Sequence, residues 1–193
     1  MPKQIPVYLF VGQLESGKTK FIQETMEDPN FDSGDKTLLL VCEEGEIEYD
    51  PKKFAFGGVH VAQIEDKSEL TQENLTALEK KSGCGRVIIE YNGMWLVQEL
   101  YDAMPDNWLV YQSLATADGT TIKTYAGDSA MRSLLLDKLR GSELLAVAAL
   151  LPGIKLDIRL LDGVYLQESI MSYSDVISAL NEGSGVHTYV AEE

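Results

Sequence analysis

One short motif restricts the fold of this chain more than any other feature. Its residues read Gly12-Gln-Leu-Glu-Ser-Gly-Lys-Thr19 and match the pattern GxxxxGK[ST] at every defined position. An apolar run, residues 5–11, precedes the motif, and a segment with helical character, residues 18–27, follows it. A buried strand, a glycine-containing turn and a helix N-terminus in this order are typical of a P-loop. The motif therefore indicates an α/β domain built on a parallel sheet.

Short apolar runs alternate with amphipathic segments along the rest of the chain. We expect further strands at residues 37–42, 58–64, 86–91, 108–115 and 142–151, and helices at residues 71–81, 95–104 and 128–140. Beyond Pro152 we expect a strand at 154–161, a helix at 172–181 and a last edge strand at 186–190. Residues 43–58 are acidic and poorly periodic, which predicts a mobile loop. The pattern predicts a doubly wound, mostly parallel sheet flanked by helices, in one domain over residues 1–193.

The charge of the chain excludes some classes of function. Asp and Glu total 31 against 16 Lys and Arg, so the formal net charge is −15. Such a field repels a phosphodiester backbone, and we expect no nucleic-acid partner. It also repels a free nucleotide, which must then be held by local donors and a metal ion.

The start of the chain and its cysteines indicate a compartment. The first apolar run is far shorter than a membrane span or a signal sequence, so we expect no membrane association. Cys42 and Cys84 are the only cysteines, too few for a disulfide framework or a CxxC zinc site. We expect a cytoplasmic protein.

The spacing within the motif fits phosphate binding. Gly12 and Gly17 let the backbone turn sharply, so that successive N–H groups face the phosphate oxygens beside the positive end of the next helix. The donors expected there belong to Leu14, Glu15, Ser16, Gly17, Lys18 and Thr19. Lys18 should reach the β- and γ-phosphates as a catalytic cation, and the Thr19 hydroxyl should ligate Mg²⁺. The motif alone predicts a nucleoside triphosphate with Mg²⁺ as cofactor.

Carboxylates stand at the ends of two other predicted strands. Glu90 ends the run Val87-Ile-Ile-Glu90, and Glu43 follows the strand at residues 37–42. Both should lie beside the P-loop, because the carboxyl ends of parallel strands meet at one edge of the sheet. Glu90 is predicted to hold Mg²⁺ through a water or to orient the attacking water, whereas Glu43 either reaches the metal or belongs to a solvated loop. Gly93 should present its N–H to the γ-phosphate.

Together these motifs resemble those of the CobW/HypB/UreG-type P-loop GTPases. The first strand and P-loop look like the start of a CobW-like domain. Cys42-Glu-Glu-Gly-Glu-Ile-Glu-Tyr-Asp50 is similar to that family's switch segment, usually Asn-Glu-x-Gly-Glu followed by an Asp, and Glu90-Tyr-Asn-Gly93 matches its ExxG element. The resemblance covers about residues 5–147.

The resemblance implies a function and assigns the site residues. It implies a slow GTPase that uses GTP and Mg²⁺ and works as a switch or as a metal-cofactor assembly factor for a metalloprotein client. Thr19, Glu43 and Glu90 become metal or water ligands, and Gly93 becomes the γ-phosphate sensor. Nucleotide-dependent homodimerisation is compatible with this class.

The chain departs from the family pattern at two places. A CxCC motif is absent where the sequence reads Phe54-Ala-Phe-Gly-Gly-Val-His60, which removes the obvious ligands for a soft metal. Instead of Asn-Lys-x-Asp the chain has Lys155-Leu-Asp157, whose charged side chains are predicted to contact guanine. Preference for GTP over ATP thus depends mainly on the resemblance. An ATP-specific ATPase or kinase, and a nucleotide-binding interaction protein without turnover, are the alternatives.

Overall fold

A parallel β-sheet forms the centre of the protein. The computed structural model describes residues 3–43, 49–118, 121, 124–125, 128–140, 142, 144–148, 170–171 and 187–190. The described strands are β1 (Ile5–Gly12), β2 (Thr37–Val41), β3 (Val59–Gln63), β4 (Arg86–Glu90), β5 (Trp108–Asp118), β6 (Leu144–Ala148), β7 (Ile170–Met171) and β8 (His187–Val190). They form one eight-stranded sheet in the order β3-β2-β4-β1-β5-β6-β8-β7, with every pairing parallel.

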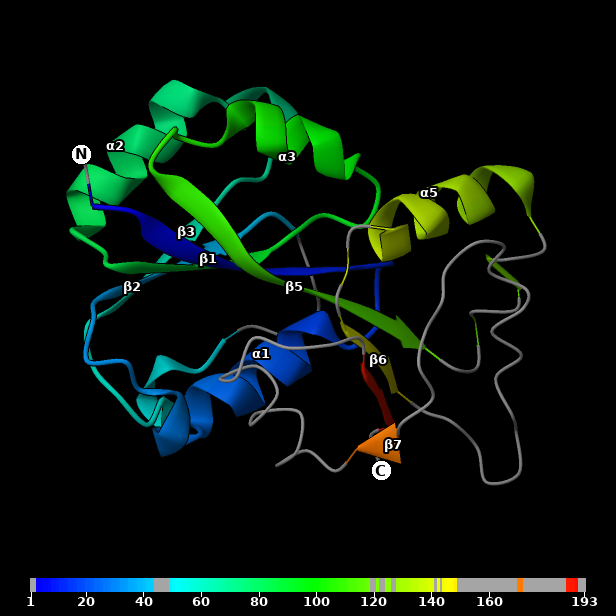
Figure 1. Ribbon diagram of the computed structural model, residues 1–193, viewed down its shortest axis with the longest axis horizontal. Helices are drawn as coiled ribbons and strands as arrows, with labels where there is room; N and C mark the ends of the chain where they lie inside the picture. The colour runs from blue at the N-terminus through cyan, green and yellow to red at the C-terminus, as the bar shows by residue number, and fades with distance from the viewer. Residues whose placement is uncertain are drawn as a thin grey trace.

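Helices cover both faces of this sheet (Figure 1). The helix α1 (Lys18–Glu27) lies on one face, and α2 (Gln72–Ser82), α3 (Val97–Ala103) and α5 (Ser129–Arg140) lie on the other. Short 3-10 turns occur in the connecting segments at η1 (Pro29–Phe31), η2 (Pro51–Lys53) and η3 (Lys67–Glu69). This arrangement confirms the predicted doubly wound α/β fold.

Alternate residues of the central strands pack into two separate cores. In β1, Val7 and Leu9 join the cluster that contains residues of α2, α3 and α5, whereas Phe10 joins the cluster around α1. In β2, Leu39 likewise belongs to the α1 side while its neighbours face the other way. Successive side chains of a strand point to opposite faces, and here both faces are covered. The unbroken apolar runs in the sequence follow from this double burial.

Most element boundaries agree with the periodicity of the sequence. The helix α2 ends where Gly83 adopts a left-handed conformation with φ of 60°. The strand β5 continues to Asp118, three residues beyond the predicted end at residue 115, because it pairs with β1 on one side and β6 on the other. The helix α3 begins at Val97 rather than at residue 95, because the Glu99 carboxylate accepts a hydrogen bond from the Leu96 N–H at 3.0 Å and caps the helix there.

The last strand differs from its predicted position at the edge. The strand β8 exists, but it lies between β6 and β7, and Ile170–Met171 pairs along its far side. Two residues paired in a ladder carry no periodicity, so β7 could not be predicted from the sequence. The predicted elements at residues 154–161 and 172–181 lie outside the described residues.

Candidate functional site

The predicted P-loop connects β1 to α1 at the carboxyl edge of the sheet. Gly17 precedes the helix with φ of 90°, and Glu15 has φ of 58°, a left-handed conformation that is uncommon for a residue with a side chain. Left-handed residues alternating with ordinary ones turn consecutive N–H groups toward a common centre, which is the geometry of an anion-binding nest. Strained backbone of this kind is concentrated at functional sites.

Both the backbone conformation and the close neighbours of Gly12 require a glycine at this position. Its φ is 151°, and a Cβ built on it would lie 2.5 Å from the carbonyl oxygen of Thr116 and 2.6 Å from the hydroxyls of Ser16 and Thr116. Those two hydroxyls are themselves hydrogen-bonded at 2.6 Å, which ties the loop to β5. No side chain fits at position 12 without displacing this contact.

Lys18 lies folded beneath the loop instead of extending into solvent. Its side chain is only 2 % exposed. The ammonium donates to the carbonyl oxygens of Gly12 at 3.0 Å and Gln13 at 2.8 Å, and it forms an ion pair with Glu43 at 2.6 Å. The cation is thus held by two carbonyl oxygens of the loop and by Glu43.

Glu43 connects the P-loop to the segment that follows β4. One carboxylate oxygen, Oε2, pairs with Lys18, and the other, Oε1, accepts a hydrogen bond from the Gly93 N–H at 3.1 Å. A Cβ on Gly93 would stand 2.8 Å from the carbonyl oxygen of Gly12 and 3.0 Å from the backbone nitrogen of Leu14. Gly93 therefore allows the two backbone segments to approach each other around one anion.

Glu90 forms a second polar centre beside the first. Its Oε1 accepts a hydrogen bond from the Thr19 hydroxyl at 2.6 Å, and its Oε2 accepts one from the Tyr49 hydroxyl at 2.5 Å. Burial raises the pKa of Glu90, although the two hydroxyls and the charge of Lys18 act in the opposite direction. Burial and the Glu90 carboxylate raise the pKa of Tyr49, so its phenol stays protonated and donates.

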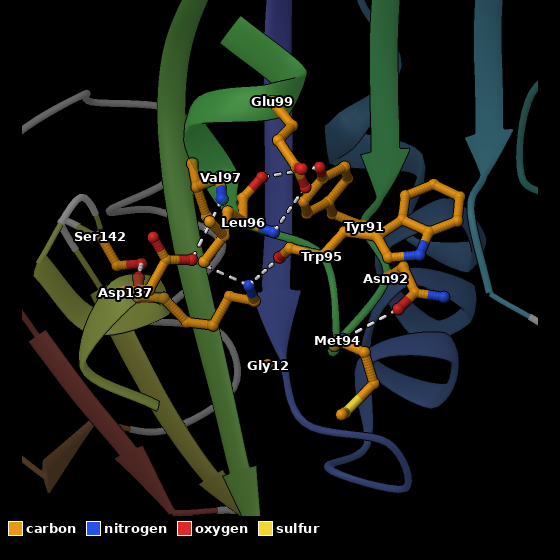
Figure 2. A network of polar contacts seen from close by, with 12 residues as sticks. Gly12, Tyr91, Asn92, Met94, Trp95, Leu96, Val97, Glu99, Asp137 and Ser142 are labelled. Carbon is orange, nitrogen blue, oxygen red and sulfur yellow. Dashed lines mark hydrogen bonds and ion pairs between the residues drawn. The ribbon is translucent and has the colours of Figure 1, made fainter. Parts of the chain in front are cut away.

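The segment after Gly93 is attached to α5 (Figure 2). The Asp137 carboxylate accepts a hydrogen bond from the Val97 N–H at 3.0 Å. Lys138 is 1 % exposed, and its ammonium donates to the Trp95 carbonyl oxygen and pairs with Asp137. Desolvation lowers the pKa of Lys138. A partly buried ion pair thus fixes the backbone two to four residues after Gly93.

The structure brings together five of the residues that the sequence singled out. Lys18 and Gly93 both contact Glu43, and Thr19 contacts Glu90 in a second set of hydrogen bonds beside the first. Lys155 and Asp157, predicted to contact guanine, lie outside the described residues, as do residues 44–48 of the predicted switch segment.

Three residues of this site were not predicted from the sequence. Tyr49, Asp137 and Lys138 contact residues about 40 positions away along the chain. Contacts between residues so far apart leave no periodic pattern in the sequence from which they could be predicted. Tyr49 does lie within the quoted switch segment, which was the one available signal for it.

Two further features are absent from the described residues. Among the described residues, no group of three or more His, Cys, Asp or Glu side chains is arranged to hold a metal ion. No helix in the described part of the chain is long and apolar enough to cross a membrane.

The likenesses between this chain and known proteins are structural. No protein-family model matches this chain, and no curated protein matches it in sequence. Among solved structures, this chain is similar to the hydrogenase maturation factor HypB from Archaeoglobus fulgidus, with 13 % sequence identity and a TM-score of 0.47. The match covers 97 % of this chain and 81 % of the HypB chain. The fold assignment depends on the strand order and the placement of the helices, not on this likeness.

Proposed function

We propose that this chain binds a nucleoside triphosphate with Mg²⁺, and that it is a slow GTPase. The observation that carries this proposal is the convergence of Lys18 and the Gly93 N–H on a single carboxylate, that of Glu43. The P-loop and the segment after β4 thus form an anion position between them, and the Glu43 carboxylate occupies it. A terminal phosphate needs a cation and a backbone donor of this kind.

The loop residues supply the rest of the phosphate site. The N–H groups of residues 14–19 would hold the α- and β-phosphates at the N-terminus of α1, where the helix dipole favours negative charge. Leu14 and Glu15 expose their side chains, so a ligand approaches this part of the loop from solvent. Gly12 and Gly93 allow the close backbone contact that this geometry requires.

The neighbouring oxygen atoms fit Mg²⁺. The Thr19 hydroxyl and the Glu90 carboxylate are 2.6 Å apart, and Mg²⁺ prefers hard oxygen donors such as these. Thr19 and Glu90 would hold the ion, directly or through water, and Glu43 could join them once it leaves Lys18. When bound, Mg²⁺ would neutralise charge on the phosphate oxygens.

Hydrolysis requires a water placed in line with the bond to the γ-phosphate. Glu90 would orient this water, and its burial beside Thr19 at the end of β4 supports that role. Lys18 and the Gly93 N–H would stabilise the charge on the transferred group. Most of the acceleration would then come from positioning and charge neutralisation.

The choice of base and the cellular role depend on the resemblance to CobW/HypB/UreG-type GTPases. We infer GTP rather than ATP, with Lys155 and Asp157 contacting guanine. We also infer a cytoplasmic switch or metal-assembly role in one domain, with a metalloprotein client and a homodimer as partners. Cys42 and Cys84 are both buried, and burial raises the pKa of both thiols.

A fluorescent GTP analogue tests the proposal. We expect Mg²⁺-dependent binding that Lys18→Ala abolishes, because the variant removes the cation at the anion position. The exposed neighbour Lys20 provides the matched control, and Lys20→Ala should bind like the wild type. Competition with unlabelled GTP and ATP then identifies the base. Undiminished binding to Lys18→Ala would refute the assignment.

A further inference from the structure

The ammonium of Lys18 has no free hydrogen-bond donor in this structure. A lysine ammonium carries three N–H groups. Gly12 O and Gln13 O accept two of them, at 3.0 and 2.8 Å, and the Glu43 carboxylate takes the third at 2.6 Å. The two carbonyl contacts are internal to the loop and hold the lysine in place. A phosphate can therefore reach Lys18 only by replacing Glu43.

Glu43 also occupies the second donor that a terminal phosphate would use. Its Oε1 accepts from the Gly93 N–H at 3.1 Å, on the opposite side of the carboxylate from Lys18. The carboxylate thus has the two contacts that the proposed function assigns to the γ-phosphate. With 9 % of its side chain exposed, it is also largely shielded from water, which strengthens its attraction to Lys18 and its repulsion of a second anion.

We propose that Glu43 is an internal substitute for the γ-phosphate and the residue that sets the preference between nucleoside diphosphate and triphosphate. This inference rests on the proposed function. A diphosphate is held by the N–H groups of the loop and leaves the Glu43 contacts intact. A triphosphate brings a γ-phosphate into the same position, and it binds only when Glu43 leaves both Lys18 and Gly93.

A conservative substitution separates this role from that of a metal ligand. Glu43→Gln keeps the size of the side chain and an acceptor for Gly93, but it removes the negative charge. If Glu43 competes with the γ-phosphate, the variant should bind triphosphate more tightly. If Glu43 chiefly ligates Mg²⁺, the same variant should bind triphosphate more weakly.

The experiment compares two nucleotides in the presence of Mg²⁺. Dissociation constants for GDP and for guanosine β,γ-imidotriphosphate, which resists hydrolysis, are measured by calorimetry for the wild type, Glu43→Gln and Glu65→Gln. Glu65 is an exposed carboxylate just beyond β3 and serves as the control for loss of one charge. We expect the triphosphate-to-diphosphate ratio of Kd to fall at least about tenfold in Glu43→Gln and to stay unchanged in Glu65→Gln.

A measurement on the wild-type protein tests the same role of Glu43 without a substitution. The Gly93 amide resonance should keep its chemical shift when GDP is added and should move when the triphosphate analogue is added. An unchanged or increased Kd ratio in Glu43→Gln, or an equal response of Gly93 to both nucleotides, would overturn the role of Glu43 while leaving the proposed function intact. Absence of any Lys18-dependent nucleotide binding would overturn both.

Discussion

Gly93→Ala is the substitution whose effect follows most directly from the geometry. The added Cβ would meet three backbone atoms of the P-loop: Gly12 O at 2.8 Å, Leu14 N at 3.0 Å and Gln13 C at 3.1 Å. Backbone atoms of a fixed loop cannot rotate away, so the segment after β4 has to move outward. Overpacking of this kind costs about 1–3 kcal/mol. For a chain of this length, that corresponds to a fall in Tm of about 2–12 °C.

The same displacement removes a donor from the proposed γ-phosphate position. A hydrogen bond to a charged group contributes about 1.5–3 kcal/mol, so triphosphate affinity should fall about 10- to 150-fold. Diphosphate affinity should change much less, because the N–H groups of residues 14–19 stay in place. Calorimetric titration with both nucleotides measures the two effects separately.

Gly57→Ala is the matched control for this substitution. A Cβ at Gly57 would meet nothing within 4 Å, so the variant should stay within about 0.5 kcal/mol of the wild type. If Gly93→Ala were as stable as Gly57→Ala and bound triphosphate normally, the close approach of the two segments would have no functional importance.

Three further predictions concern the buried charges. Glu90→Gln should retain nucleotide affinity but lose turnover by about 100-fold or more in a phosphate-release assay, since it removes the group that orients water; wild-type turnover would exclude that role. Burial raises the pKa of Glu90 above its usual value of 4.5, so the stability that its protonated form contributes is present below pH 4.5 and is lost as pH rises through the raised pKa. The Tm of the wild type relative to Glu90→Gln should therefore increase as pH is lowered from 8 to 5, and a constant difference would contradict the shift. Lys138→Met removes the donor to the Trp95 carbonyl oxygen and should lower the free energy of unfolding in urea by about 1–3 kcal/mol, whereas exposed Lys80→Met should change it by less than about 0.5 kcal/mol; equal stability of the two variants would refute a structural role for Lys138.

The parts of the site that the sequence predicted are those encoded by local spacing or by sheet topology. Residues 12–19 lie between a strand and a helix that are both visible in the sequence, so their conformation could be predicted from a short stretch of the chain. The places of Glu43 and Glu90 followed from one rule, that parallel strands end at the same edge of the sheet, and Gly93 comes three residues after Glu90. Both arguments need only the order of elements along the chain.

The unpredicted parts depend on contacts between distant residues. Glu43 was expected beside a metal or in solvent, and its ion pair with Lys18 depends on how β2 and β4 place their ends around the loop. Asp137 lies on an amphipathic helix whose polar positions all resemble a solvated face in the sequence. Only the packing of α5 shows that Asp137 and Lys138 meet the segment after β4. The two-residue strand β7 is too short to carry any pattern.

A crystal structure with Mg²⁺ and guanosine β,γ-imidotriphosphate is the most direct test of the anion position between Lys18 and Gly93. We predict that the γ-phosphate lies between the Lys18 ammonium and the Gly93 N–H, with Mg²⁺ beside the Thr19 hydroxyl and the Glu43 carboxylate displaced from both donors. Glu43 still paired with Lys18, and the triphosphate bound elsewhere on the protein, would contradict it.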